Sequence, residues 1–329
     1  MLFTPSDPAQ RRLDFARRAP PTGQWLRREE AIMGTAITVE LWCADRRAGA
    51  AAIDAVMAEM HRIDRTMSPH KPDSELSRIN REAGERPVPL SDEMYRLVAA
   101  SLAFSKVSGG AFDISYAAVG QLYDYREARL PDAAAIAAAR RNVGWQWLEL
   151  DRREHTLRFT RPGMRIDLGG FAKGHAVDNA AQILKSRGIE HAHVAAGGDS
   201  RVIGDRRGRP WTIAIRDPRS QGVVAVLPLE DVAISTSGDY ERFFERDGVR
   251  HHHIVDPATG RSPGGVHSVT VLGPDGLVTE ALSKSVFVLG PERGITLAES
   301  FEGVDVIVVD AQGRLHRSAG LLDGRALQQ

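Results

Sequence analysis

The sequence has very little cysteine, no excess of charge and no long apolar run. Cys43 is the single cysteine among 329 residues, which excludes an intrachain disulfide framework and a cluster of thiolate metal ligands. The 43 basic and 43 acidic residues balance, so the chain as a whole has no electrostatic basis for binding nucleic acid or an anionic bilayer. No apolar stretch is long enough for membrane insertion. With 42% hydrophobic residues, the chain can still bury a sizeable globular core.

The N-terminal segment also lacks a feature, the apolar stretch of a signal peptide. Residues 1–28 are rich in Arg and Pro, which predicts a flexible arm ahead of one domain at 29–329. Because neither a signal peptide nor a lipobox is visible, the expected localisation is cytoplasmic. A chain trimmed of its leader would look the same, and would be exported.

Hydrophobic periodicity predicts an α+β fold with a largely antiparallel sheet core and flanking helices, because strands that are adjacent in sequence dominate. The predicted helices cover 48–67, 91–108, 131–143 and 276–289, with a short helix capped by Asp73 or Ser74 and another after residue 171. The predicted strands cover 32–42, 147–150, 156–160, 193–196, 201–204, 211–216, 223–229, 232–237, 252–255, 267–271 and 305–309, with one more ending at 164–166.

The most informative stretch is DLGGFAKGH at residues 167–175, followed by a helical run and AAGGD at 195–199. We expect a strand–helix–strand unit with glycines at the helix N-terminus, where free N–H groups and the helix dipole favour an anion. Lys173 would then contact a phosphate or a ribose. The alternative is a solvated lysine in the first turn, with glycines that serve only close packing.

Eight motifs, in order, are similar to those of one known family. They are MGT at 33–35, SPHKPDSELSRIN at 68–80, GGAFDIS at 109–115, DLGGFAKGHAVD at 167–178, AAGGDS at 195–200, STSGDY at 235–240, HIVDPATG at 253–260 and TEALSKSVFVLG at 279–290. Together they resemble the ApbE family of flavin transferases, the FAD:protein FMN transferases. The resemblance covers nearly the whole chain from about residue 30.

The resemblance implies a donor, FAD, an acceptor and a set of site residues. A partner protein would accept FMN on a Ser or Thr hydroxyl as a phosphoester, with release of AMP. The residues that it assigns to the flavin and its pyrophosphate are Met33, Ala111, Phe112, Asp113, Asp167, Lys173 and Ile254. It places His253 near the reacting phosphate, as the base that deprotonates the acceptor. The residues alone favour a strand-end histidine bonded to Asp256, and it is the resemblance that favours the base.

The chain departs from the family pattern at two places. His70 stands where the family usually has a tyrosine near the flavin. The usual D-A-L-S-T, whose aspartate and threonine bind Mg²⁺ beside a backbone carbonyl (here that of Gly170), reads E-A-L-S-K at residues 280–284. An ammonium cannot be a metal ligand, so Lys284 could pair with Glu280 at i+4 and fill the cation site beside the pyrophosphate. Alternatively, Lys284 turns to solvent while Glu280 and Ser283 still hold the metal.

Two functions from different classes follow. The first is FMN transfer, with His253 as base, Lys173 and Lys284 on the pyrophosphate, and Mg²⁺ if Glu280 can bind it. The second is an FAD-binding protein that has lost the metal-dependent activity and acts as a flavin carrier or redox module. A dinucleotide-binding G-x-G-x-x-G after the first strand and a hydrolase G-x-S-x-G elbow are both missing from the sequence.

Overall fold

A computed structural model describes residues 22–322. Its centre is an eight-stranded sheet with the order β1-β2-β6-β7-β10-β13-β14-β15. Every neighbouring pair in this sheet is antiparallel, which confirms the predicted α+β fold. The strands are β1 (Gln24–Ile32), β2 (Thr35–Cys43), β6 (Ala192–Ala196), β7 (Asp199–Ile203), β10 (Ala233–Gly238), β13 (Val266–Gly273), β14 (Asp305–Asp310) and β15 (Leu315–Arg317).

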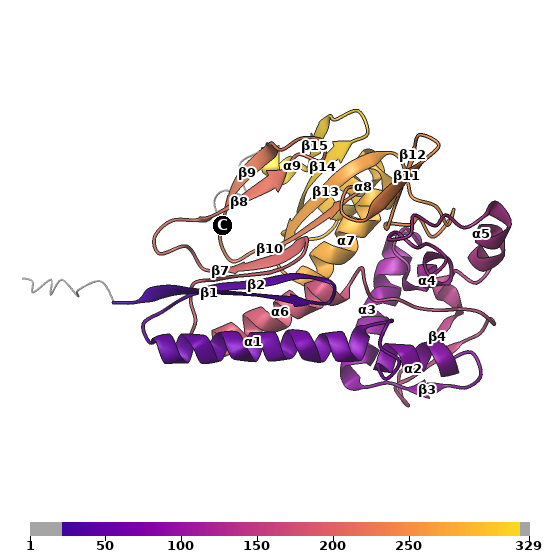
Figure 1. The fold of residues 1–329 in the computed structure, drawn as a ribbon, viewed down its shortest axis with the longest axis horizontal. Coiled ribbons are helices and arrows are strands. Elements are labelled where there is room, and N and C mark those ends of the chain that lie inside the picture. The colour runs from indigo at the N-terminus through magenta and orange to yellow at the C-terminus, as the bar shows by residue number, and fades with distance from the viewer. Residues whose placement is uncertain (1–21, 323–329) are drawn as a thin grey trace, which may run out of the picture.

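Helices α1, α6 and α7 cover one face of this sheet, where the main hydrophobic core is buried (Figure 1). The helices are α1 (Arg46–Met67), α2 (Glu75–Glu82), α3 (Asp92–Val107), α4 (Ala117–Gly120), α5 (Ala133–Arg140), α6 (Ala172–Ser186), α7 (Gly276–Leu289), α8 (Pro291–Glu299) and α9 (Ala319–Leu322). Of the two caps predicted for α2, Asp73 and Ser74, the structure has Ser74, whose side chain accepts the Ser77 N–H. No helix within 22–322 is long and apolar enough to cross a membrane.

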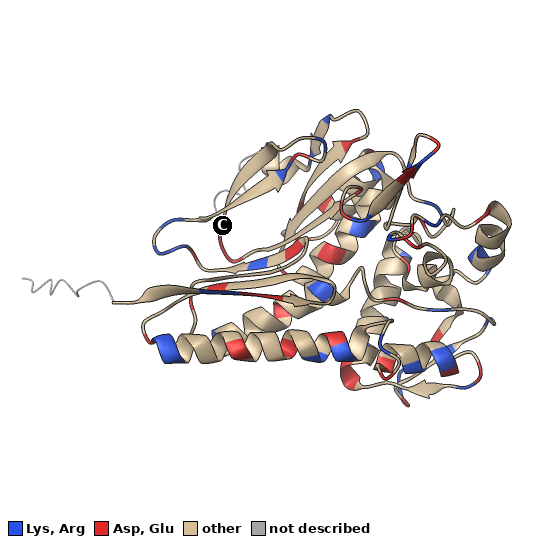
Figure 2. Cartoon of the chain, in the orientation of Figure 1, with Lys and Arg blue, Asp and Glu red and all other residues tan. Residues whose placement is uncertain are grey.

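The segment between α1 and α6 forms a second, mainly helical region beside the sheet (Figure 1). It holds α2 to α5, two 3-10 turns at Ile114–Tyr116 and Trp145–Trp147, and a small sheet with the order β3-β5-β4. Its strands are β3 (Val88–Pro89), β4 (Leu148–Asp151) and β5 (Thr156–Phe159). Two further hairpins, formed by residues that follow α6, pair β8 (Trp211–Arg216) with β9 (Val223–Leu229) and β11 (Phe243–Arg246) with β12 (Val249–His252). Figure 2 shows acidic and basic residues interspersed along the same elements, in keeping with the balanced composition.

The structure corrects several predicted boundaries. The arm predicted for 1–28 is wrong for residues 24–28, since β1 begins at Gln24 and pairs with β2 over nine residues; residues 1–21 lie outside the described part of the chain. Residues 253–255 follow β12 rather than forming a strand. Residues 164–166 are also not a strand, because the Asn80 side chain bonds both the N–H and the C=O of Ile166 in place of a neighbouring strand.

Candidate functional site

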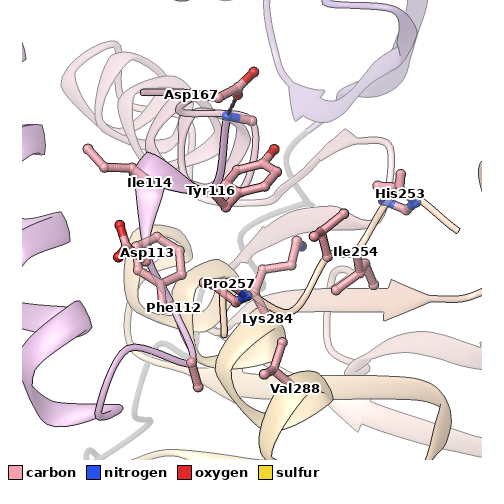
Figure 3. Close-up of a pocket in the computed structure, with 14 residues that line it drawn as sticks. Phe112, Asp113, Ile114, Tyr116, Asp167, His253, Ile254, Pro257, Lys284 and Val288 are labelled. Atoms are coloured by element: carbon pink, nitrogen blue, oxygen red, sulfur yellow. Dashed lines mark hydrogen bonds between the residues drawn. The ribbon is translucent and has the colours of Figure 1, made fainter. Parts of the chain in front are cut away.

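A partly open cavity lies where the helical region meets the sheet region (Figure 3). Four segments form it: residues 111–116 after α3, the loop 167–170 before α6, residues 253–257 after β12, and one face of α7. Its lining residues are Ala111, Phe112, Asp113, Ile114, Tyr116, Asp167, Gly169, Gly170, His253, Ile254, Val255, Pro257, Lys284 and Val288. The cavity therefore combines apolar walls with a few polar groups, which is the usual composition of a small-molecule site.

Asp113 holds the first wall in place. Its carboxylate accepts the Ser115 N–H (2.8 Å), the Ser115 hydroxyl (2.6 Å) and the Trp145 N–H (2.8 Å). Burial raises the pKa of Asp113, although these hydrogen bonds oppose the rise. Because its oxygens already accept backbone and hydroxyl protons, the side chain fixes the 3-10 turn that carries Tyr116 into the cavity.

The loop 167–170 forms the second wall. Asn80 fixes Ile166 at its start, and Asp167 accepts the Gly169 N–H. Burial raises the pKa of Asp167, and the charges of His70 and Arg242 act in the opposite direction. The charge of Asp167, together with burial, raises the pKa of Tyr116 well above its ordinary value, so this phenol stays protonated.

His253 enters the cavity from the turn after β12. Its backbone N–H donates to the Arg242 carbonyl (3.0 Å), while its Nδ1 is buried and has no hydrogen-bond partner within residues 22–322. Asp256, the partner in the alternative prediction, instead accepts the Ala258 N–H at 2.8 Å. Burial, followed by the positive charge of Lys284, lowers the pKa of His253 to about 3. The imidazole is therefore neutral across the physiological range, and the lowered pKa makes it a weaker base than a free histidine.

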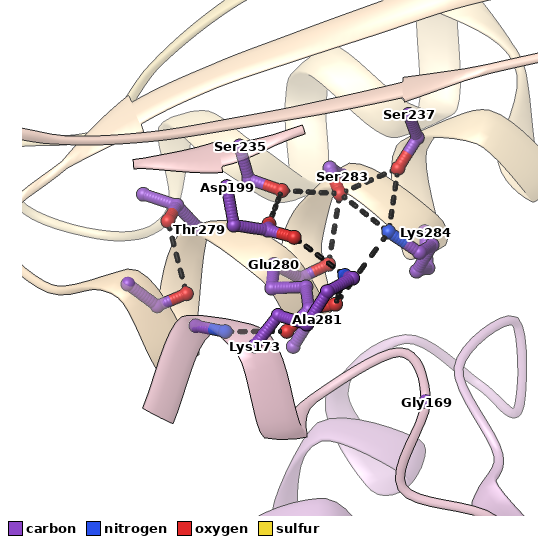
Figure 4. Close-up of polar contacts among 12 residues, drawn as sticks. Gly169, Lys173, Asp199, Ser235, Ser237, Thr279, Glu280, Ala281, Ser283 and Lys284 are labelled. Carbon is purple, nitrogen blue, oxygen red and sulfur yellow. Dashed lines mark hydrogen bonds and ion pairs between the residues drawn. The ribbon is translucent and has the colours of Figure 1, made fainter. Parts of the chain in front are cut away.

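Lys173 lies beside the cavity in a buried polar network (Figure 4). Its Nζ is 2.5 Å from both Asp199 Oδ2 and Glu280 Oε1. Burial lowers the pKa of Lys173, but the two carboxylates outweigh this effect and raise it overall. Lys173 is therefore not a lining residue, and its ammonium is paired with two carboxylates, from β7 and α7, rather than free in solvent.

Lys284 is the cation that reaches the cavity itself. Its Nζ lies 2.8 Å from Ser237 Oγ, 3.5 Å from Ser283 Oγ and 4.0 Å from Glu280 Oε1. A Cβ added to Gly170 would lie 3.5 Å from Lys284 Cγ, so the lysine stem packs against the loop. The predicted i+4 pair with Glu280 is present, and the alternative in which Lys284 turns to solvent is not what the structure adopts, since the side chain is only 18% exposed.

The side-chain oxygens predicted to bind Mg²⁺, those of Glu280 and Ser283, already have other partners. Glu280, which is fully buried, accepts from Lys173 Nζ and from the Gly174 N–H (2.7 Å), and Ser283 Oγ contacts the hydroxyls of Ser235 and Ser237. Within the described chain, no group of three or more His, Cys, Asp or Glu side chains could hold a metal ion. Magnesium needs oxygen ligands at about 2.0–2.1 Å in near-octahedral geometry. As arranged, Gly170, Glu280 and Ser283 do not fit this ion.

Of the residues predicted for the flavin, Ala111, Phe112, Asp113, Asp167 and Ile254 line the cavity. Met33 lies instead at the β1–β2 turn, with a φ of 53°, and His70 is exposed near Asp167. The residues predicted from the sequence did not include Ile114, Tyr116, Gly169, Val255, Pro257 and Val288, which also line the cavity. Five of these lie within three residues of a predicted one, so proximity in the motif was the available signal; Val288 follows Lys284 by one helical turn.

Comparison with known proteins agrees with this geometry. The ApbE family matches residues 33–308. Among curated relatives, the FAD:protein FMN transferase of Treponema pallidum is 33% identical over 90% of this chain and 87% of its own, and that of Vibrio cholerae is 35% identical over 78% of each. Among solved structures, the ApbE protein of Thermotoga maritima superposes with a TM-score of 0.84 at 33% identity, covering 91% of this chain and 98% of its own.

The fold and the cavity thus place this chain among the α+β proteins that share the fold of the solved flavin transferases. The chain belongs to the ApbE family.

Proposed function

We propose that this protein is an FAD:protein FMN transferase that places FMN on a Ser or Thr hydroxyl of an acceptor protein through a phosphoester bond. The observation that supports this most is the convergence of four distant segments on one cavity, which brings Phe112, Asp167 and Ile254 together with His253. Relatives over most of the chain carry the name of this activity.

The cavity suits FAD as a substrate. Phe112, Ile254, Pro257 and Val288 offer apolar surface to a flat ring system, and Lys284 offers a positive charge to a pyrophosphate.

In the proposed reaction, the acceptor oxygen forms a bond to the FMN phosphorus, the pyrophosphate P–O bond breaks, and AMP leaves with the bridging oxygen. His253 accepts the hydroxyl proton, since its imidazole is neutral and lines the cavity. Lys284 stabilises the negative charge that develops on the phosphoryl oxygens. The chain's expected partner is a flavin-accepting protein, and its expected place of action is the cytoplasm.

The test is a flavinylation assay with FAD and a threonine-containing acceptor peptide, read by in-gel flavin fluorescence and mass spectrometry. His253→Ala should lower the transfer rate by at least about 100-fold while FAD binding is kept, because a positioned base contributes roughly 10²–10⁴-fold. His61→Ala, at an exposed histidine of α1, is the matched control and should transfer like the native protein. Unchanged transfer in His253→Ala would refute the assigned role.

A second function is favoured by one observation, the presence of an ammonium where the family pattern has a metal ligand. An FAD-binding protein without transferase activity would use the same cavity as a flavin carrier or redox module. Stoichiometric FAD binding by the native protein, with no flavinylated product for any acceptor peptide, would select this second function.

A further inference from the structure

Two lysines, two carboxylates and three serines form one contact network beneath the cavity. It joins Lys173 of α6 and Asp199 of β7 to Glu280 and Lys284 of α7, with hydroxyls supplied by Ser235, Ser237 and Ser283 (Figure 4). The formal charges of the lysines and carboxylates sum to zero. The network is therefore complete as a charge-neutral unit, without an added ion.

The hydrogen-bonding capacity of this network is unevenly used. Glu280 has a close donor on each oxygen, and Asp199 pairs with Lys173 and the Ser235 hydroxyl (2.6 Å). Lys284 is different: an ammonium has three N–H donors, and one is satisfied at 2.8 Å by Ser237 Oγ. The other contacts, at 3.5 and 4.0 Å, are long, so this ammonium keeps donor capacity toward the cavity that it lines.

A divalent cation at this place would meet two obstacles. It would have to displace Lys173 or the Gly174 N–H from Glu280, and it would lie next to the ammonium of Lys284. Like charges at such short range in a poorly solvated site repel strongly. The same position nevertheless carries a positive charge, because Lys284 supplies it covalently.

We propose that Lys284 takes the place of a divalent metal in this protein, so that the cavity binds the pyrophosphate of its ligand through a built-in ammonium and without Mg²⁺. This inference rests on the proposed function for the identity of the ligand as FAD. Beyond that function, we infer that the phosphate part of the ligand is bound without a metal, whereas the apolar walls bind the ring.

The experiment measures equilibrium binding of FAD and of riboflavin, which has the ring but no phosphate, by flavin fluorescence in excess EDTA and in excess MgCl₂. The native protein should bind FAD with a Kd that changes less than about twofold between the two conditions, and calorimetry with MgCl₂ alone should show no binding to the unliganded protein. Lys284→Met, similar in length but uncharged, should weaken FAD binding in EDTA by about tenfold or more and riboflavin binding by less than about twofold. Lys284→Arg should retain most of the native affinity for FAD.

The control variant is Lys185→Met, at a half-exposed lysine of α6 that should leave both affinities unchanged. FAD binding that requires Mg²⁺ in the native protein, or equal FAD affinity in Lys284→Met, would overturn the inference and leave the proposed function standing. Failure of the native protein to bind either ligand would overturn both. The magnesium titration of the native protein needs no variant, so a Lys284 variant that misfolds does not remove the test.

Discussion

His253 and Lys284 are the two residues whose chemistry the surrounding structure changes most directly. Burial and the nearby ammonium both disfavour a charged imidazole, so His253 stays neutral although its ordinary pKa is close to neutrality. Lys284 is also buried, which lowers its own pKa, with Glu280 opposing that effect. The pair thus concentrates one positive charge on the lysine and leaves the histidine free to accept a proton.

The depressed pKa of His253 has a measurable effect on stability. The unfolded chain binds a proton at this histidine below about pH 6.5, whereas the folded chain does so only near a pKa of about 3. Stability is therefore lost as the pH falls through this window, by at most about 1.4 kcal/mol per pH unit. His253→Asn should show a shallower decline between pH 6.5 and 4.5, measured by urea unfolding at a series of pH values. The exposed His61→Asn should keep the native slope, and an unchanged slope in His253→Asn would contradict the neutral assignment.

At the scale of elements, the site depends on how closely α6 and α7 approach one another. A Cβ built on Gly174 would lie 2.1 Å from the Gly276 carbonyl oxygen, so any larger residue forces the two helices apart. This close contact also brings the Gly174 N–H to Glu280 and sets Lys173 between the two carboxylates.

Gly174→Ala should therefore destabilise the fold and disturb the site together. We expect a loss of about 1–3 kcal/mol in the free energy of unfolding, as for other overpacked positions, with weaker FAD binding. Gly84→Ala is the matched control, since a Cβ there meets nothing within 4 Å, and it should stay within about 0.5 kcal/mol of the native value. Equal stability of the two variants, measured by urea unfolding, would show that the helices separate without cost.

The elements also show what the sequence could and could not predict. Periodicity predicted α7, β8 and β9 with their observed bounds, because each is a regular pattern of apolar residues. It missed β1, where the charged run of residues 27–30 hides a strand that forms by pairing with β2.

Contacts between residues that are distant in the sequence limit how much of the site can be predicted from the sequence. The hydrogen bonds between Asn80 and Ile166 join positions 86 apart, and Lys173 meets a carboxylate 107 positions away. No local pattern encodes such distances. The lining residues that were predicted correctly were assigned by the resemblance of the motifs. The two carboxylates that pair with Lys173 could be identified only from the three-dimensional structure.

At the scale of the molecule, an ion network fastens the sheet-covering helices to the helical region. Arg62 of α1 makes paired hydrogen bonds with Glu59 and with Glu93 of α3, at 2.7–2.8 Å, and His175 of α6 contacts Glu93 at 2.8 Å. Helix α6 thus turns Lys173 toward the site and His175 toward this network from its first turn. Because the cavity has walls from both regions, whatever fastens the regions also maintains the cavity.

The network should control acid stability in a window different from that of His253. The hydrogen bond with His175, followed by that with Arg62, lowers the pKa of Glu93 from 4.5 to about 2. Its contribution to stability is fully present above about pH 4.5 and is lost as the pH falls from 4.5 toward 2, since the unfolded chain takes up the proton first.

Glu93→Gln should lower the free energy of unfolding by about 2 kcal/mol near neutral pH, the order of a hydrogen-bonded charged group, and should flatten the decline below pH 4.5. It should not remove the decline between pH 6.5 and 4.5, because that part comes from the histidines whose pKa is lowered by burial, His253 together with His193, His251 and His252. Urea unfolding of the native protein, of each single variant and of the double variant separates the two pH ranges; a change in the upper range for Glu93→Gln as large as that for His253→Asn would contradict this separation.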